Sequence, residues 1–336
     1  MPTDPPTPRR ILVTGVGANP GFGLTRSLTR LGHKVIAADA NPLAPGLLLP
    51  DVVPQVIPLA TDPDYPSIMV KVCRDLAVDA VVAGIENDIP PLVDMLPQLE
   101  ADGVRLWLPD AESVRACIDK AAFHEVLTEH GIATPRTWRP EAIDQAPDRT
   151  ELVVKPRRGH GAQNVHFVHR REHARFLCEL VPEPVVQERV HGREFTADCL
   201  VDRAGRASVI LRRRDLVKAG LAAVSTTFDD PTVRDLVIKT LAAVRARGVC
   251  CVQGFICDGA IVITELNVRI AGGFPLTEAA GADLVGQMVN GLFGLPVNHD
   301  CLTYRTGVFL TNYVETLAVG DVAELERTAA AKGSPS

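Results

Sequence analysis

The sequence predicts an α/β fold, with a parallel-sheet domain at the N-terminus followed by a larger α+β region. In the first third of the 336 residues, apolar strand-like runs alternate with amphipathic helical segments, as in parallel βαβ units. From residue 150 onward, strands joined by short turns alternate with single helices, which is typical of α+β architecture. A chain of this length has room for two or three domains.

The first third is expected to contain three strands separated by helices. The strands are read at 9–15, 33–41 and 79–85, and the helices at 21–32 and 66–78. A further short strand is expected to end at residues 107–109. Residues 110–131 form one long amphipathic helix or a helix pair that stops at Gly131, and Pro135 follows, so a domain boundary is expected here.

The second region begins with a strand at 151–156 and a glycine-bearing hairpin at 157–168. The next expected elements are a helix at 171–181, three strands within 185–214, a helix at 231–248 and a hairpin at 249–268. The chain ends in AAAKGSPS, which is typical of a frayed helix and tail.

The composition excludes several classes of protein. Basic residues number 35 and acidic residues 41, for a formal net charge of -6, so no nucleic-acid partner is expected. No apolar run approaches the ~18 residues of a membrane span. The proline-rich, charged MPTDPPTPRR is unlike a signal peptide, so a cytoplasmic location is expected. The eight cysteines include no C-x-x-C pair, and we expect reduced, mostly buried thiols.

The most informative polar residues lie in IVITELNVRIAGGFP, residues 261–275. If this segment is a strand, Glu265, Asn267 and Arg269 share one face, because side chains alternate with period two. Carboxylate and amide oxygens suit Mg²⁺, and the neighbouring guanidinium can bind phosphate oxygens. The same row is also compatible with the polar outer face of a half-buried strand.

Two lysines are further candidates for contact with phosphate. Lys155 ends a strand and precedes PRRGHGAQNV, where Gly159 and Gly161 let the backbone approach a phosphate and offer its N–H groups. Lys120 begins the second half of the 110–131 segment and could equally be a surface lysine.

Two other groups of charged residues can be interpreted as either structural or functional. Glu188 and Glu194 stand on either side of a tight turn, which could be a charged hairpin tip. His166, His169 and His173 come closest to the spacing of metal ligands, but the arginines around them favour an exposed helix.

Four segments, taken in order, resemble the ATP-grasp superfamily, and in particular a single ATP-grasp unit of the carbamoyl phosphate synthetase large subunit. They are DKAAFHEVLTEHGIATP, LVVKPRRGHGAQNV, VVQERVHGREFTADCLVD and VQGFICDGAIVITELNVRIAGG, and the resemblance runs from residue 10 to 315. It implies an N-terminal Rossmann-like parallel-sheet domain that does not bind ATP, followed by an ATP-grasp fold of two α+β subdomains with ATP between them.

The resemblance also divides the chain. A flexible N-terminus at 1–10 precedes a Rossmann-like pre-ATP-grasp domain at 11–112. The ATP-grasp lid or central subdomain follows at 113–184 and the C-terminal subdomain at 185–315, and a helix and tail occupy 316–336.

The resemblance implies the residues that contact ATP. Lys120 and Lys155 match the lysines at the phosphates, with Lys155 also near the adenine, and the loop at 159–164 would close over the β- and γ-phosphates. Glu188 and Val190 would meet the adenine edge through backbone groups. Glu194 would accept hydrogen bonds from the ribose hydroxyls.

The resemblance likewise implies a Mg²⁺ site in which Mn²⁺ can substitute. Gln253, Glu265 and Asn267 match the metal ligands, and Arg269 matches the arginine that contacts phosphate. The family's Asn-Pro-Arg has Val268 in place of proline here, which keeps the ligand types and loses rigidity. The alignment at Gln253 could slip, so Glu265 and Asn267 are the stronger metal candidates.

The implied activity is that of an ATP-dependent carboxylate-amine ligase. In the resembled family a small carboxylate, here expected to be an amino acid or a similar acid, attacks the γ-phosphate to give an acyl phosphate and ADP. An amine then displaces phosphate, so no protein nucleophile is needed. The alternative is a carbamoyl phosphate synthetase-like carboxylate or carbamate kinase, although that large subunit carries two such units. A noncatalytic regulator would bind ATP without turnover.

The substrate contacts are harder to assign. Arg212 and Arg214 share one strand face, and either could bind the carboxylate or support its oxyanion; a basic exposed strand edge is an equal alternative. Ser225 to Thr227 are plausible loop contacts, and the turn before the helix at 275 could hold an anion. The expected partners are therefore small-molecule carboxylate and amine substrates, and a homodimer is an option that the resembled proteins often adopt.

The stretch TGVGANPGFG follows the first strand and is close to a dinucleotide-binding motif. Its spacing departs from G-x-G-x-x-G because Pro20 takes the place of the third glycine, and Asp39 is followed by a turn-like Ala-Asn-Pro. A nicotinamide oxidoreductase would need NAD at this motif. We interpret it instead as the floor of a domain that helps enclose the acceptor substrate, with Glu86, Asn87 and Asp88 as candidate contacts.

Overall fold

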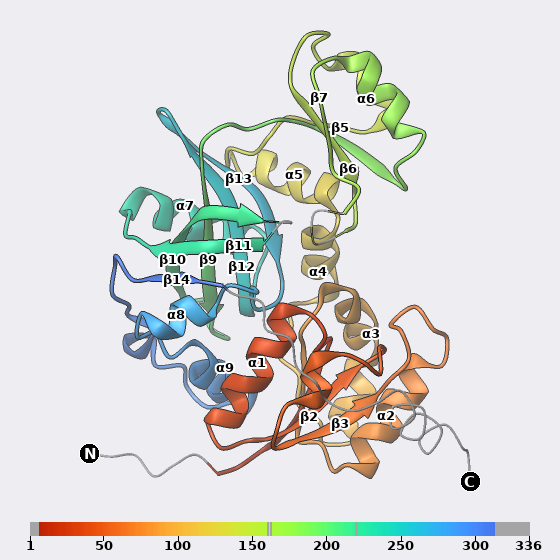
Figure 1. Cartoon of the computed structure of the whole chain (residues 1–336), viewed down its shortest axis with the longest axis vertical. Helices are drawn as coiled ribbons and strands as arrows, with labels where there is room; N and C mark the ends of the chain where they lie inside the picture. Colours follow the sequence, from red (N-terminus) through yellow and green to blue (C-terminus); the bar gives the residue numbers. More distant parts are fainter. Residues whose placement is uncertain (1–6, 160, 162, 219–220, 313–336) are drawn as a thin grey trace.

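The computed structural model describes residues 7–159, 161, 163–218 and 221–312. Its strands form three sheets: a four-stranded parallel sheet, a six-stranded antiparallel sheet and a smaller four-stranded antiparallel sheet. Figure 1 shows the parallel sheet at one end of the molecule, the small sheet at the other, and the six-stranded sheet beside the helices that connect them. The predicted fold class is confirmed.

The N-terminal domain is a parallel sheet in the order β3-β2-β1-β4. Its strands are β1 (Arg10–Thr14), β2 (Lys34–Asp39), β3 (Val52–Val56) and β4 (Ala80–Ala83), and its helices are α1 (Asn19–Arg30), α2 (Tyr65–Asp75) and α3 (Ile89–Ala101). Short 3₁₀ turns, η1 (Pro45–Leu48) and η2 (Glu86–Asp88), follow β2 and β4.

Two features of this domain differ from the sequence expectation. Residues VVPQV form β3, an element that the sequence analysis did not include. The strand contains Pro54 and lies at the edge of the sheet, where a missing N–H is tolerated. The prediction of a short strand that ends at residues 107–109 was wrong. Only an isolated bridge from Ala80 to Arg105 forms there.

The segment at 110–131 is a pair of helices, α4 (Ala111–Ile118) and α5 (Lys120–Glu129). Asp119 separates them, since its backbone is extended with φ -91° and ψ 107°. Its carboxylate accepts hydrogen bonds from the N–H groups of Ala121 and Ala122, so it caps α5. Asp110 caps α4 in the same way through Ser113.

The segment predicted as the lid contains the small sheet, in the order β5-β8-β6-β7. Its elements are β5 (Thr137–Trp138), η3 (Pro140–Gln145), β6 (Leu152–Pro156), β7 (His166–Val168), α6 (Arg171–Cys178) and β8 (Pro184–Glu188). Trp138, Leu152, Val154 and Val186 form its own small core. Because β8 belongs to this sheet, the sheet ends at Glu188, beyond the predicted limit of residue 184.

The six-stranded sheet has the order β13-β12-β9-β10-β11-β14. Its strands are β9 (Arg193–Val201), β10 (Ala207–Lys218), β11 (Leu221–Thr227), β12 (Gly248–Cys257), β13 (Ala260–Asn267) and β14 (Phe309–Thr311). The accompanying helices are α7 (Pro231–Ala243), α8 (Pro275–Ala279), α9 (Leu284–Leu292) and the 3₁₀ turn η4 (His299–Leu302). The expected tail helix at 316–336 lies outside the described residues.

One face of this sheet is apolar and packs on α7. Phe195, Ala197 and Cys199 of β9 lie in the same buried cluster as Val233 and Val237 of α7. Side chains alternate along each strand, so the residues between them on β9 face the opposite side. The opposite face carries the polar residues of the candidate site.

All eight cysteines are free and most are buried, as expected. Among the described residues, no helix is both long and apolar enough to cross a membrane.

Candidate active site

The register of the six-stranded sheet gathers polar residues on one face. Thr196 of β9 lies opposite Arg212 on one side and Gln253 on the other, and Gln253 lies opposite Glu265. Because directly opposed residues point to the same side of a sheet, these side chains form one row. The same face carries the predicted site residues Glu194, Arg212, Arg214, Gln253, Glu265 and Asn267.

The oxygen donors predicted for a metal lie at the β12–β13 end of this face. Gln253 and Glu265 are directly opposed, and the register shifts immediately after that pair. Such a bulge changes the direction in which the strand presents its side chains. Asn267 is buried, and its Oδ1 accepts a hydrogen bond of 3.3 Å from Arg269.

The two predicted phosphate lysines converge on this row from other elements. Lys120 at the start of α5 is buried and its Nζ donates to the carbonyl oxygen of Gly159 at 2.9 Å. Removal from water lowers the pKa of Lys155, at the end of β6, to about 8; Glu265 opposes this shift and Lys120 adds to it. Lys155 therefore lies within electrostatic reach of both Lys120 and Glu265.

The N-terminal domain contributes Glu86 to the same region. Burial raises the pKa of Glu86 to about 7, and Glu265 adds to the shift, whereas Arg269 and Lys120 oppose it. Three parts of the chain thus meet here: η2 after β4, the α5 helix with the lid, and the hairpin of β12 and β13. A carboxyl group balanced between its two forms near neutral pH is typical of a functional site.

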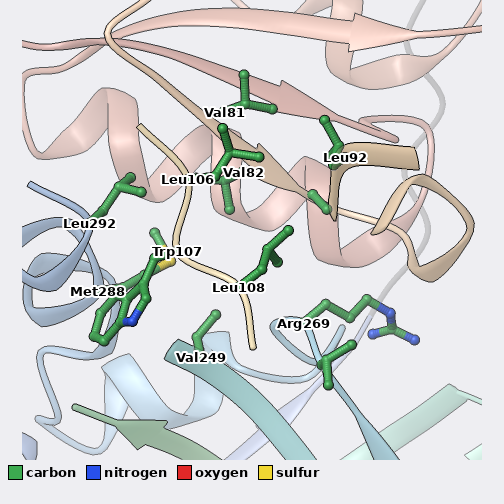
Figure 2. Close-up of a pocket in the computed structure, with 12 residues that line it drawn as sticks. Val81, Val82, Leu92, Leu106, Trp107, Leu108, Val249, Arg269, Met288 and Leu292 are labelled. Carbon is green, nitrogen blue, oxygen red and sulfur yellow. The ribbon is translucent and has the colours of Figure 1, made fainter. Parts of the chain in front are cut away.

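Figure 2 shows that Arg269 lies beside an apolar crevice where the two domains meet, which we call the joint. Val81, Leu106, Met288 and neighbouring side chains line a crevice there, and the guanidinium of Arg269 extends away from them. Its Nη1 donates to the carbonyl oxygen of Ile270 at 3.0 Å. The alkyl part of Arg269 therefore contacts the joint while its charge lies near Glu86.

The predicted substrate arginines are both paired with carboxylates. Arg212 is buried and donates to Asp198 through Nε at 2.9 Å and Nη2 at 3.2 Å, and Thr277 also donates to Asp198 at 2.5 Å. A Cβ on Gly273 would come within 2.5 Å of the Arg212 guanidinium, so a larger residue there would require that buried, paired group to shift. Arg212 lies at the base of the polar face, which favours a role in positioning neighbours over direct contact with substrate.

The residues predicted for adenine and ribose lie at the junction of lid and sheet. Arg214 forms an ion pair with Glu194, the predicted ribose acceptor. Glu188 forms a two-pronged ion pair with Arg136, at 3.0 and 3.1 Å, and Val190 is half-buried just after β8. Of the predicted loop at 159–164, residues 160 and 162 lie outside the described residues, and Gly161 has φ +65°, a conformation that favours glycine.

The histidines with metal-like spacing are not brought together. His169 lies 3.3 Å from Glu151, whereas His173 lies beside Glu172 on the exposed α6. Within the ranges that the structure describes, no group of three or more His, Cys, Asp or Glu side chains could hold a metal ion.

A pair of residues that the sequence did not single out connects Lys120 to the lid. Arg157, just after β6, forms an ion pair with Asp119, the cap of α5, and the N–H of Lys120 donates to the carbonyl oxygen of Arg157 at 3.1 Å. Burial opposes ionisation, yet Arg157 and the helix N–H groups hold the pKa of Asp119 below its ordinary value. An aspartate just before an amphipathic helix is an N-cap signal that could have identified it.

If Lys120 contacts ATP as the resemblance implies, Asp119→Ala raises the KM for ATP by about 10-fold, with a smaller change in kcat. The change removes the cap of α5 and the partner of Arg157, so Lys120 and the end of β6 lose their shared anchor. Steady-state kinetics at varied ATP measures the split. Asp110→Ala is the matched control, because it removes the cap of α4 at a similar cost of ~1 kcal/mol. Equal KM effects in both variants would contradict a positioning role.

The glycine-rich turn after β1 is closed by the protein's own acceptors. The N–H of Gly17 donates to Asp39 Oδ2 at 2.7 Å, and the N–H of Ala18 donates to the carbonyl oxygen of Gly15 at 3.1 Å. Asp39 Oδ1 accepts from the N–H of Asn41 at 2.9 Å. The Asp39 carboxylate therefore already accepts the hydrogen bond from the Gly17 N–H, which a bound phosphate would otherwise accept.

Asp88 is a buried carboxyl at the same edge of the parallel sheet. Burial raises its pKa to about 6, the Thr14 hydroxyl opposes the shift and Asp39 adds to it. A carboxyl whose pKa is higher in the folded state than in the unfolded state destabilises the fold once it ionises. The destabilisation grows as the pH rises from about 4 to about 6 and is complete above that range.

Asp88→Asn is accordingly expected to increase the free energy of unfolding at about pH 8 by ~2 to 3 kcal/mol, and to change it little at about pH 4. Urea unfolding at the two pH values measures the difference. Asp51→Asn, which removes an exposed carboxylate from the same domain, should leave stability nearly unchanged. A gain at low pH equal to that at high pH would argue against the ionised carboxylate as the cause.

Comparison with known families divides the chain between residues 107 and 117, a stretch that contains most of α4. Residues 117–273 match the family model described as ATP-grasp domain. Residues 11–107 match the model described as PylC-like, N-terminal domain.

Solved structures share this arrangement. An L-amino acid ligase from Bacillus licheniformis aligns with a TM-score of 0.72 at 18% identity over 89% of this chain and 77% of that one. A biotin carboxylase from Campylobacter jejuni gives 0.69 at 14% identity over 86% and 72%. An N5-carboxyaminoimidazole ribonucleotide synthetase from Thermus thermophilus gives 0.66 at 17% over 86% and 79%. At these identities the likeness concerns the fold.

Proposed function

We propose that this chain, whose residues 117–273 match the ATP-grasp domain model, is an ATP-dependent carboxylate-amine ligase that activates a small carboxylate as an acyl phosphate and joins it to an amine, releasing ADP and phosphate. The observation that carries the proposal is the convergence of Lys120, Lys155, Arg269 and Glu265, from three parts of the chain, on one polar face. The acid is expected to be an amino acid or a similar small compound.

The donor set of the β12–β13 hairpin fits a magnesium ion. Glu265 supplies a carboxylate and Gln253 and Asn267 supply amide oxygens, all on one face of the sheet, and hard oxygen donors of this kind suit Mg²⁺. Mg²⁺ held there would neutralise charge on the phosphates of ATP.

The cations of the chain would complete the site for phosphoryl transfer. Lys120 and Lys155 are placed to meet phosphate oxygens, and Lys155, with its pKa near 8, remains mostly protonated at neutral pH. Arg269 would bind the transferred phosphate and support the oxyanion formed when the amine attacks the acyl carbon. Asp198 and Arg212 beneath them hold the floor of the site in place.

Glu86 is placed to handle the proton that the amine must lose. Its pKa near 7 lets it accept a proton at neutral pH without being permanently charged. Its position on η2 puts it between the ATP-grasp hairpin and the N-terminal domain, where the second substrate would enter.

The proposal is tested by incubating the purified protein with Mg-ATP and a panel of small acids, each with and without an amine, and measuring ADP, phosphate and product mass. ADP release that needs Mg²⁺ and both substrates is the expected result. Release of AMP would contradict acyl phosphate chemistry. ADP release with bicarbonate or carbamate alone would favour the alternative, a carbamoyl phosphate synthetase-like kinase.

A further inference from the structure

The carboxyl ends of all four strands in the parallel sheet meet around one pocket. Gly15 follows β1, Asp39 ends β2, Ile57 follows β3 and Asp88 follows β4, and each of them lines this pocket, which has a volume of about 120 Å³. After β1 the chain adds β2 and β3 on one side of that strand, and it then adds β4 on the other side, which gives the order β3-β2-β1-β4. Ligands of open parallel sheets bind in the crevice that such a change of direction creates.

The pocket is acidic. Its charged side chains are Asp39 and Asp88, and Asn87 adds an amide. Among the described residues that line it, none is a lysine, arginine or histidine, and Ile57, Leu59 and other apolar groups supply the rest. A phosphate or carboxylate group entering this pocket would find no cation, and a positively charged group would find two carboxylates.

The backbone around the pocket does not favour the binding of an anion either. The N–H of Gly17 is already bound to Asp39, and that of Val16 donates to the carbonyl oxygen of Ala38. Two N–H groups of the loop that corresponds to the phosphate-binding loop of dinucleotide-binding domains therefore already have acceptors within the chain.

Asp88 has no compensating cation among the described residues that act on it. It is 4% exposed, and its neighbours are Asp39 of β2, the Thr14 hydroxyl of β1 and the Tyr65 hydroxyl of α2. The Tyr65 hydroxyl is buried with no hydrogen-bond partner in the part of the chain that the structure describes. A buried carboxylate beside a second carboxylate is costly unless a cation joins them.

The pocket is adjacent to the candidate active site. Glu86 and Asp88 belong to the same 3₁₀ turn, η2, with Glu86 within electrostatic reach of Lys120, Arg269 and Glu265 and Asp88 on the pocket. Their Cα atoms are two residues apart, which limits their separation to about 7 Å. A ligand on Asp88 therefore lies next to the groups proposed for chemistry.

We propose that this pocket binds the amine substrate of the ligase, and that it selects a small aliphatic compound whose ammonium group pairs with Asp88 and Asp39 and which carries no phosphate. The apolar part of the substrate packs on Ile57 and Ile85. This inference rests on the proposed function, since it assigns the second substrate of that reaction.

The chemistry of the proposal is balanced. The bound ammonium first loses a proton to water or a carboxylate. The neutral nitrogen then attacks the acyl carbon, the C–N bond forms, and the C–O bond to phosphate breaks with its electron pair leaving on phosphate. The second nitrogen proton is released as the amide forms.

Charge selection can be measured with two probes of equal size: n-butylammonium and n-butanol. Ligand-observed saturation-transfer NMR on the full chain is expected to show n-butylammonium binding at least 10-fold more strongly than n-butanol. Asp88→Asn is expected to reduce that preference by about 10-fold or more, and it should fold, since it removes a buried charge and keeps the shape. Asp51→Asn is the matched control, because it removes one negative charge outside the pocket.

n-Butanol binding as strongly as n-butylammonium, or an unchanged preference in Asp88→Asn, would overturn the inference. Glu265→Ala separates it from the proposed function, because that change should stop ADP formation and leave n-butylammonium binding intact. If n-butylammonium binds selectively while no acid supports ADP release, the assignment of the pocket is supported and the ligase proposal is refuted. If ADP release depends on Glu265 and the probes bind equally, the ligase proposal is supported and the assignment of the pocket is refuted.

Discussion

Glu265→Gln is expected to lower Mg²⁺-dependent ADP formation by about 10² to 10³-fold. Glu265 is the only carboxylate in the proposed metal set, directly opposite Gln253 and on the same face as Asn267. Glutamine keeps the size of the side chain and removes the charge that would bind the metal and oppose the low pKa of Lys155. The measurement is initial-rate ADP release at saturating ATP, with and without a chelator.

Two comparisons make this prediction specific. Asp258→Asn removes an exposed carboxylate from the turn of the same hairpin and should leave ADP formation unchanged. In Glu265→Gln the pKa of Lys155 should fall further, because Glu265 now raises it, and NMR of the lysine side chain can follow this. A variant that keeps most of the wild-type rate would refute the assignment of Glu265 to the metal.

Asp198→Ala is expected to lower the free energy of unfolding by about 3 to 5 kcal/mol. Asp198 is 1% exposed and holds the buried guanidinium of Arg212 through two hydrogen bonds, while Thr277 of α8 donates to the same carboxylate. Without Asp198, Arg212 becomes a buried charge that has lost its carboxylate, and α8 loses a contact with the sheet. Urea or guanidinium unfolding measures the change.

The double variant Asp198→Leu with Arg212→Met should recover most of that stability, because both charges are removed together. Its activity then decides the role of Arg212: a stable double variant that still forms ADP indicates that Arg212 positions the site, and a stable but inactive one indicates direct contact with substrate. As a control, Asp102→Ala breaks the exposed pair with Arg74 and should cost ~1 kcal/mol or less. An equal cost at both positions would show that burial of the pair does not determine its contribution.

Hydrophobic periodicity was sufficient to predict β1, β2, β4, α1 and α2, because buried parallel strands are continuous apolar runs and the helices are amphipathic. Periodicity did not identify β3, which contains Pro54. A proline is acceptable in this strand because the strand lies at the edge of the sheet. Periodicity also left the α4 and α5 segment undecided, since one capping side chain, Asp119, separates two helices whose apolar patterns are similar.

Of the predicted row, Arg269 lies beyond β13, which ends at Asn267. The common face of Glu265 and Asn267 was predictable for a reason comparable to that for the strands. Period-two alternation within one strand is local, so the sequence alone places these side chains on a common face. The opposition of Gln253 to Glu265 depends on a hairpin register with a bulge, and the sequence left that alignment open.

The sequence by itself determined the order of the domains, the strands with strong periodicity and the types of residue available for phosphate and metal. Only the tertiary structure decided which of those residues meet. It placed Glu86 near Lys120 and Arg269, paired Arg212 with Asp198, and closed the glycine-rich turn with Asp39. The physical reason is that a side chain's type is local, whereas its charge state and its partners depend on burial and on residues distant in the chain.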